Sequence, residues 1–296
     1  MKNIFIGVGC EPQQELAYQV LKNSIEVNFS SQKYNIKIKP LHRLEIPSYV
    51  NKIILKKQGT PFSFQRFYFA HWVSENANDF DLGIYLDSDM LVFSNIESLA
   101  ETFLDLDQAI AICDTKKYWG RKQQQAVMAF NCHGAVEIKN KFIKYANGDI
   151  NYKNLMTKPN YKSLLPFTWN SQEEIMHDTN LIHYTDMDFQ PWLKKDNMNA
   201  GIWLSYLRLF IKSEDGKNLL VNEILKKNVR PSLAELLQNP PNHPVVSFSW
   251  SLKDIFFIPP HRLKIFSGVT RTILAPALNI FLYFSKIIKN NRVNKI

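Results

Sequence analysis

Two acidic residues lie inside an otherwise apolar segment of the chain. Residues 83–93 read GIYLDSDMLVF, so a single residue separates Asp87 from Asp89. Residues i and i+2 of a strand share one face about 6.6 Å apart, and a bend at the strand end would bring both carboxylates to one ion. Buried carboxylates need charge compensation, and such oxygen ligands suit Mg²⁺ or Mn²⁺, which also bind substrate phosphates. The pattern therefore predicts a divalent metal site; the alternative is a pair of capping or turn aspartates.

A histidine further along the chain could complete this site. Residues 181–192 read LIHYTDMDFQPW, which places His183 at the end of a short apolar strand. A single histidine in such a place is more often a hydrogen-bonded core residue. Together with Asp87 and Asp89, however, it makes a set of two oxygen ligands and one nitrogen ligand, which fits Mn²⁺ better than Mg²⁺.

The alternation of strands and helices predicts the architecture that must position these residues. We expect strands at 3–8, 35–41, 82–86 and 109–113, and helices at 13–28, 60–77 and 96–104. Further along, we expect two strand pieces in 127–138 broken at 131–134, a polar loop or lid at 147–170, a strand at 179–186, and helices at 199–213 and 217–228. This order is typical of a doubly wound, largely parallel α/β sheet, whose ligands bind beyond the carboxyl ends of the strands.

Composition and charge narrow the class of protein. The 296 residues are 45% hydrophobic and 21% charged, which suffices for one large α/β domain or two small ones. From residue 255 onward there are seven basic residues and no acidic ones, which leaves 29 basic and 27 acidic residues elsewhere. A nucleic-acid-binding surface would spread its basic residues over the fold, so we expect no nucleic-acid partner. The three cysteines show neither a disulfide framework nor a zinc pattern, which favours a reducing, cytoplasmic compartment.

The C-terminal segment 256–296 combines basic and apolar residues. Residues 272–285 read TILAPALNIFLYFS and carry no charge. This stretch is shorter than the about 20 residues that cross a bilayer. Because Arg271 and Lys286 flank it, we expect 262–296 to contact an anionic membrane surface, on the inner face of the membrane. The alternative is a helix that docks on the main domain or on a second subunit in a homodimer.

Five motifs carry a resemblance to a known family. In chain order they are IFIGVG near the N-terminus, S-x-x-R-F at 63–67, YLDSDMLVF, FNCHG at 130–134 and LIHYTD…QPW. This chain resembles the family 8 glycosyltransferases, which include glycogenin and bacterial lipooligosaccharide galactosyltransferases. The resemblance covers residues 1–200 and implies a GT-A type doubly wound mixed sheet in a single catalytic domain, 1–255. It also implies a UDP-hexose or related donor, a divalent cation, a glycan or lipid-linked acceptor, and transfer with retention of anomeric configuration.

The resemblance also implies a role for individual residues. Asp89 would bind the metal, Asp87 would bind it and reach the donor ribose, and His183 would be the third protein ligand. Arg66 would face the diphosphate or the transferred sugar. The other residues implied to contact the donor are Gly7, Gly9 and Glu11 near the base and ribose, Asn131 and Gly134 in the sugar pocket, and Ser88, Gln190 and Trp192.

The chain departs from the family pattern at two places. Gln190 stands where family members usually have a lysine that neutralises the leaving diphosphate, and Lys194 or Lys195 could substitute for it. No Asp-Gln pair occurs between residues 135 and 165, where the family has one beside the reacting sugar. The segment 165–174 offers Asn170, Gln172 and Glu173 instead, and we expect Asn170 and Glu173 to be catalytic. The alternative for segment 165–174 is a surface loop without a catalytic role, which packs Trp169 inward.

Two other functions stand as alternatives to a glycosyltransferase. A sugar-nucleotide nucleotidyltransferase would have a similar fold, but it would normally show a basic phosphate loop near the N-terminus, and residues 7–15 contain no Lys or Arg. A catalytically inactive relative that binds glycan or membrane as an adaptor would explain Gln190 and the missing Asp-Gln pair.

Overall fold

The computed structural model describes residues 1–50, 61–77, 81–113, 125–156, 164–237 and 252–261. The chain divides into two compact units, 1–185 and 186–296. The domain boundary that we expect after residue 255 stays a prediction, and the segment 262–296 lies outside the described residues. Among the residues that the structure describes, no helix is both long enough and apolar enough to span a bilayer.

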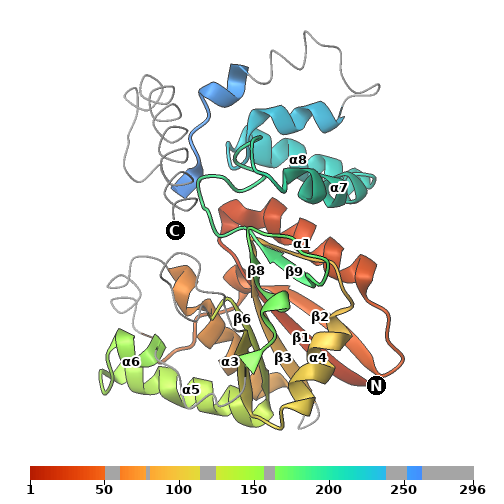
Figure 1. Cartoon of the computed structure of the whole chain (residues 1–296). Helices are drawn as coiled ribbons and strands as arrows, with labels where there is room; N and C mark the ends of the chain where they lie inside the picture. Colours follow the sequence, from red (N-terminus) through yellow and green to blue (C-terminus); the bar gives the residue numbers. More distant parts are fainter. Residues whose placement is uncertain (51–60, 78–80, 114–124, 157–163, 238–251, 262–296) are drawn as a thin grey trace, which may run out of the picture. The chain divides into compact units, whose positions relative to one another are not determined.

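A six-stranded mixed sheet forms the centre of the first unit (Figure 1). Its strands, in spatial order, are β2 (Tyr34–Pro40), β1 (Lys2–Gly9), β3 (Leu82–Asp87), β6 (Val127–Asn131), β5 (Ile110–Cys113) and β7 (Leu164–Leu165). Strand β1 runs parallel to both β2 and β3, whereas β6 runs antiparallel to β3 and β5. The predicted mixed α/β architecture is therefore confirmed.

Helices cover both faces of this sheet. The helices α1 (Glu15–Asn28) and α4 (Ile96–Asp105) pack on one face, and α3 (Gln65–Asn76) and α5 (Cys132–Asn147) pack on the other. Successive strand residues point to opposite faces, so Ile4, Ile6 and Val8 join the core beneath α1 and α4, while Phe5 joins the core beneath α3 and α5. Because both faces are covered, β1 and β3 are apolar nearly throughout rather than alternating.

A second, small sheet continues from the end of β3. It contains β4 (Met90–Val92), β9 (Leu181–His183) and β8 (Ser171–Gln172), in the order β4-β9-β8. Strand β9 runs antiparallel to β4, with His183 opposite Met90, and parallel to β8. The run 83–93 thus belongs to two sheets, and the chain turns between them at the acidic pair.

One sequence expectation is wrong and others are only partly met. Residues 127–138 are not two strand pieces, because β6 ends at Asn131 and α5 begins at once. The Asn131 side chain accepts a hydrogen bond from the backbone N–H of Gly134 (3.0 Å), which caps the helix.

The expected strand 179–186 is shorter in the structure and covers only residues 181–183. The predicted loop 147–170 contains α6 (Tyr152–Met156), β7 and a 3₁₀ turn at Phe167–Trp169, and its residues 157–163 lie outside the described residues, so the lid stays a prediction.

The second unit contains α7 (Ala200–Phe210) and α8 (Glu214–Leu225), as the sequence predicts, followed by a 3₁₀ segment at Pro231–Leu237. The fully buried Trp203 of α7 packs against Trp192, with ring centroids 5.5 Å apart. The buried Arg230 donates to the carbonyl of Pro191 (3.1 Å) and lies 3.8 Å from the carboxylate of Asp254. This unit therefore has its own aromatic packing and its own ion pair, between a buried arginine and a partly buried aspartate.

Candidate metal centre

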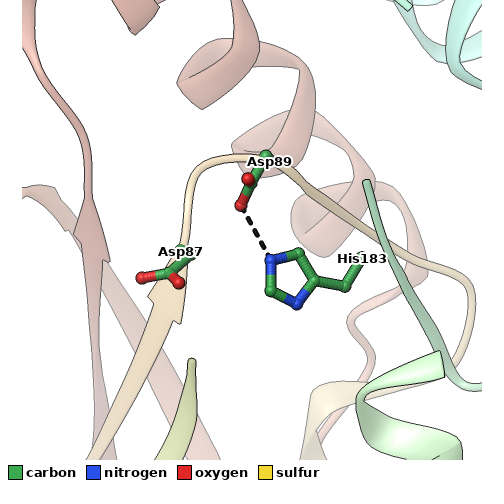
Figure 2. A group of neighbouring side chains, drawn as sticks. All are labelled: Asp87, Asp89 and His183. Atoms are coloured by element: carbon green, nitrogen blue, oxygen red, sulfur yellow. Dashed lines mark ion pairs between the residues drawn. The ribbon is translucent and has the colours of Figure 1, made fainter. Parts of the chain in front are cut away.

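The three predicted metal ligands lie together in the first unit. Asp87, Asp89 and His183 each offer one ligand atom, and these atoms lie within 4.8 Å of one another. Asp87 ends β3, Asp89 lies in the turn before β4, and His183 ends β9 (Figure 2). Because β9 pairs with β4, it carries the imidazole to the acidic pair from a distant part of the chain. The expected bend at the end of the strand is thus present.

His183 has an acidic partner on one ring nitrogen and an amide on the other. Its Nε2 lies 3.2 Å from Oδ1 of Asp89, and its Nδ1 lies 2.9 Å from Oδ1 of Asn170. An amide oxygen only accepts hydrogen bonds, so Nδ1 carries a proton. Burial lowers the pKa of His183, but the Asp89 and Asp87 carboxylates outweigh burial and leave this pKa above its ordinary value. In the protein without metal, the ring therefore keeps its second proton to a higher pH than a free histidine.

Asp87 is a buried carboxylate with two compensating partners. The hydroxyl of Tyr85 donates to its Oδ1 (2.5 Å), and Nη2 of Arg66 lies 3.8 Å from the same oxygen. Burial raises the pKa of Asp87, and the positive charge of Arg66 opposes that shift. Both interactions use Oδ1 of Asp87.

Arg66 supports Asp87 from the neighbouring helix α3. Its guanidinium lies over the ring of Tyr85 at 5.0 Å, and its Nη1 donates to the backbone carbonyl of Gln125 (2.6 Å). The side chain is buried, so the charge is held in place rather than left mobile in water. Sequence reasoning missed Tyr85, although the strand period alone places residues 85 and 87 on the same face of β3.

The ligand set fits a divalent ion of the Mg²⁺ or Mn²⁺ kind. Two carboxylates formally balance the two charges of such an ion, and a neutral imidazole adds a nitrogen ligand that favours Mn²⁺. The nearby guanidinium of Arg66 then leaves the centre positively charged. A centre of this composition attracts anionic oxygens, of which phosphate oxygens are the usual partners.

Several buried polar atoms around these ligands have no hydrogen-bond partner among the described residues. They are Oγ of Ser88, Nδ2 of Asn170 and Nε of Arg66. Each unsatisfied buried group costs about 1–3 kcal/mol, and such groups are rare in native proteins. All three belong to residues next to, or in contact with, a predicted metal ligand. Their placement therefore provides hydrogen-bond donors for a polar ligand bound at this centre.

The glycines that the family resemblance assigns to the donor site have packing roles here. A Cβ on Gly7 would lie 2.5 Å from the Phe69 ring, and one on Gly9 would lie 2.1 Å from the Tyr85 hydroxyl. Gly9 pairs with Asp87 across the strands, and its carbonyl accepts a hydrogen bond from the Ser88 N–H (2.9 Å). Because Gly9 has no side chain, the Tyr85 hydroxyl has room to donate its hydrogen bond to Asp87. The predicted contacts of these glycines with a donor stay predictions.

Asn131 and Gly134 likewise shape the fold beside the sheet. Asn131 caps α5, and a Cβ on Gly134 would lie 2.0 Å from the backbone oxygen of Ala109. Glu11 precedes a 3₁₀ turn, where its N–H donates to the Gln14 side chain (2.8 Å). The sugar and base contacts predicted for these residues remain predictions.

The remaining predicted residues divide between the two units. Glu173 follows β8, with a left-handed φ of 57° that is uncommon for this residue type, and its N–H donates to the carbonyl of His183 (3.0 Å). Its carboxylate accepts from the Thr185 hydroxyl (3.3 Å). Gln190 and Trp192 are buried in the second unit. Their roles at the donor site stay predictions.

A second cluster of titratable side chains lies after β1, and burial disfavours a nucleophilic role for it. Sγ of Cys10 lies 3.1 Å from Nδ1 of His42, whose Nε2 lies 3.6 Å from Glu15. The order thiol, imidazole, carboxylate is that of a catalytic triad. However, burial raises the pKa of Cys10 to about 12, and burial lowers the pKa of His42. A fully buried thiol whose pKa is raised in this way is a poor nucleophile.

No protein-family model and no curated protein matches this chain. Among solved structures it is similar to the apo form of the glycosyltransferase GlyE of Streptococcus pneumoniae TIGR4, with a TM-score of 0.49 and 18% identity. That match covers 77% of this chain but 64% of GlyE, so the chain spans less than two-thirds of that protein.

Two further solved structures show the same kind of likeness. The galactosyltransferase LgtC, in complex with donor and acceptor sugar analogues, matches with a TM-score of 0.45 and 13% identity over 70% of this chain and 95% of LgtC. A glycosyltransferase involved in glycosylation of the major capsid of PBCV-1 matches with a TM-score of 0.44 and 15% identity over 63% of this chain and 94% of that chain. The function proposed below rests on the side chains of the site.

Proposed function

We propose that this protein is a metal-dependent glycosyltransferase that moves a hexose from a nucleoside-diphosphate sugar to a glycan or glycolipid acceptor. The observation that carries the proposal is the convergence of Asp87, Asp89 and His183 on one point at the carboxyl end of β3. In sheets of this kind, ligands bind beyond the carboxyl ends of the strands. The family resemblance of the motifs further favours UDP-hexose as donor and retention of anomeric configuration.

Transfer of a sugar from a nucleoside diphosphate creates negative charge on the leaving phosphate. A divalent ion, when bound, supplies positive charge against that developing negative charge. Asp87, Asp89 and His183 would hold the ion. Arg66 and Tyr85 would keep Asp87 ionised and oriented although it is buried. Ser88 Oγ and Asn170 Nδ2, which pair with no residue that the structure describes, would donate to oxygens of the bound donor substrate.

The acceptor side of the proposal depends on the C-terminal segment. We propose that 262–296, with its basic and apolar residues, holds the enzyme at an anionic membrane surface, where a lipid-linked acceptor would be found. A homodimer contact is the competing role for the same residues. Liposome flotation with and without anionic lipid separates these two roles.

The proposal is tested by incubating the protein with a panel of nucleotide sugars and Mn²⁺. We expect one donor to release nucleoside diphosphate slowly in the absence of an acceptor, and we expect EDTA to stop this release. Asp89→Asn should lower the rate by about 100-fold or more, because charge stabilisation at the leaving group is lost. Glu75→Gln is the matched control, since Glu75 also pairs with a histidine (His71, 3.4 Å) but lies on α3 and is half-exposed.

Three outcomes would contradict the proposal. Release of pyrophosphate instead of nucleoside diphosphate would show a nucleotidyltransferase. Calorimetry that detects no binding of any donor in the presence of Mn²⁺ would favour an adaptor without catalysis. Donor turnover that EDTA leaves unchanged would remove the role of the metal centre.

A further inference from the structure

Asn170 lies directly behind the imidazole of His183. It is the residue between the 3₁₀ turn Phe167–Trp169 and strand β8, and it is 2% exposed. Its N–H donates to the carbonyl of Phe167 (2.8 Å), and the parallel pairing of β8 with β9 sets Gln172 beside His183. The backbone therefore fixes the position from which Oδ1 of Asn170 reaches Nδ1 of His183 at 2.9 Å.

We propose that Asn170 is a positioning residue that holds the proton of His183 on Nδ1 and so directs the lone pair of Nε2 toward the metal ion. A neutral imidazole carries its single proton on either nitrogen, and only the Nδ1–H form can coordinate through Nε2. This inference rests on the proposed metal-dependent function. It assigns to Asn170 a role that acts through His183 rather than on the sugar.

The competing arrangement is visible in the same geometry. Nε2 of His183 lies 3.2 Å from Oδ1 of Asp89. If the proton moved to Nε2, it would be donated to that carboxylate, and one hydrogen bond would then occupy two of the three ligands. An acceptor on Nδ1 disfavours this form, because moving the proton would leave the buried amide oxygen without a donor.

Packing alone does not account for an amide at this position. The Nδ2 of Asn170 is buried and has no hydrogen-bond partner in the described part of the chain, which costs about 1–3 kcal/mol. A leucine has nearly the same shape and would fill the same space without that cost. The carboxamide oxygen instead supplies the hydrogen bond to the ligand histidine, and partners that orient a metal ligand in this way typically contribute 10–100-fold to metal affinity.

Two isosteric variants test the proposal in the full chain. Asn170→Leu keeps the shape and removes the acceptor, whereas Asn170→Asp keeps both the shape and an acceptor oxygen. The dissociation constant for Mn²⁺ alone, measured from the EPR signal of free Mn²⁺, should rise about 10–100-fold in Asn170→Leu. In Asn170→Asp it should stay within a few-fold of the wild type. Equal affinity of Asn170→Leu and wild type would overturn the inference.

A measurement on the unmodified protein keeps the test independent of folding of the variants. The ¹⁵N chemical shifts of His183 in the Mg²⁺-bound wild type should show a protonated Nδ1 and an unprotonated Nε2, and the reverse assignment would contradict the inference. Failure of the wild type to bind either ion would instead overturn the proposed function. The two failures are therefore distinguishable.

Discussion

Binding of a divalent ion should release a proton from His183. In the protein without metal, Nε2 pairs with Asp89 at 3.2 Å while Nδ1 donates to Asn170, so the ring is held as an imidazolium. Coordination through Nε2 requires that the proton on this nitrogen leave. Below the pKa of His183 we therefore expect close to one proton released per ion bound. At more acidic pH, where Asp87 also takes up a proton, the number should exceed one.

The pH dependence of metal affinity follows from the raised pKa of His183. Burial lowers this pKa, but the carboxylates of Asp89 and Asp87 raise it by more than burial lowers it, so it lies above the ordinary 6.5 in the folded protein. Without metal, the stabilisation from the charged ring is complete below the unfolded pKa and is lost as pH rises through the folded pKa. Metal binding has the opposite trend: affinity should rise about tenfold, or about 1.4 kcal/mol, per pH unit below the folded pKa and level off above it.

Isothermal titration of Mn²⁺ into the protein checks this prediction. The apparent enthalpy, compared in two buffers with different ionisation enthalpies, gives the number of protons released. His71→Gln is the control, because His71 also pairs with an acid, Glu75, outside the site. An apparent enthalpy independent of the buffer, or an affinity independent of pH around the ordinary imidazole pKa of about 6.5, would refute the reasoning.

Two further predictions concern stability. Tyr85→Phe removes the hydroxyl that donates to Asp87, so urea denaturation at neutral pH should show a loss of about 1.5–3 kcal/mol. This loss should shrink at acidic pH as Asp87 becomes protonated, and a constant loss would contradict the assignment. Gly134→Ala should cost about 3 kcal/mol, because its Cβ would lie 2.0 Å from a backbone oxygen that cannot move aside. Gly201→Ala, in open space on α7, should instead stabilise the protein by about 0.5–1 kcal/mol, and similar effects of both alanines would count against the steric argument.

Local sequence patterns predicted most of the first unit. The apolar runs of β1 and β3, the spacing in α1 and α4, and the short run of β5 each carry enough local signal to identify the element. Strand β6 and helix α5 show where that signal was misjudged. The apolar residues Ala135, Ile138 and Phe142 recur at helical spacing after a capping asparagine, so the sequence encodes this helix directly after the apolar strand that ends at residue 131.

The residue types in the sequence identify the chemistry of the site, whereas the pairing of distant strands sets its geometry. Acids in an apolar run and a histidine at a strand end already indicate metal ligands, because their residue types fix their chemistry. The pairing of β9 with β4 brings His183 to Asp89. The pairing of β8 with β9 brings Asn170 to His183. Pairing between strands distant in sequence depends on the packing of the whole unit. No local pattern could therefore show which amide would lie behind the histidine, or that Arg66 and Tyr85 would share one oxygen of Asp87.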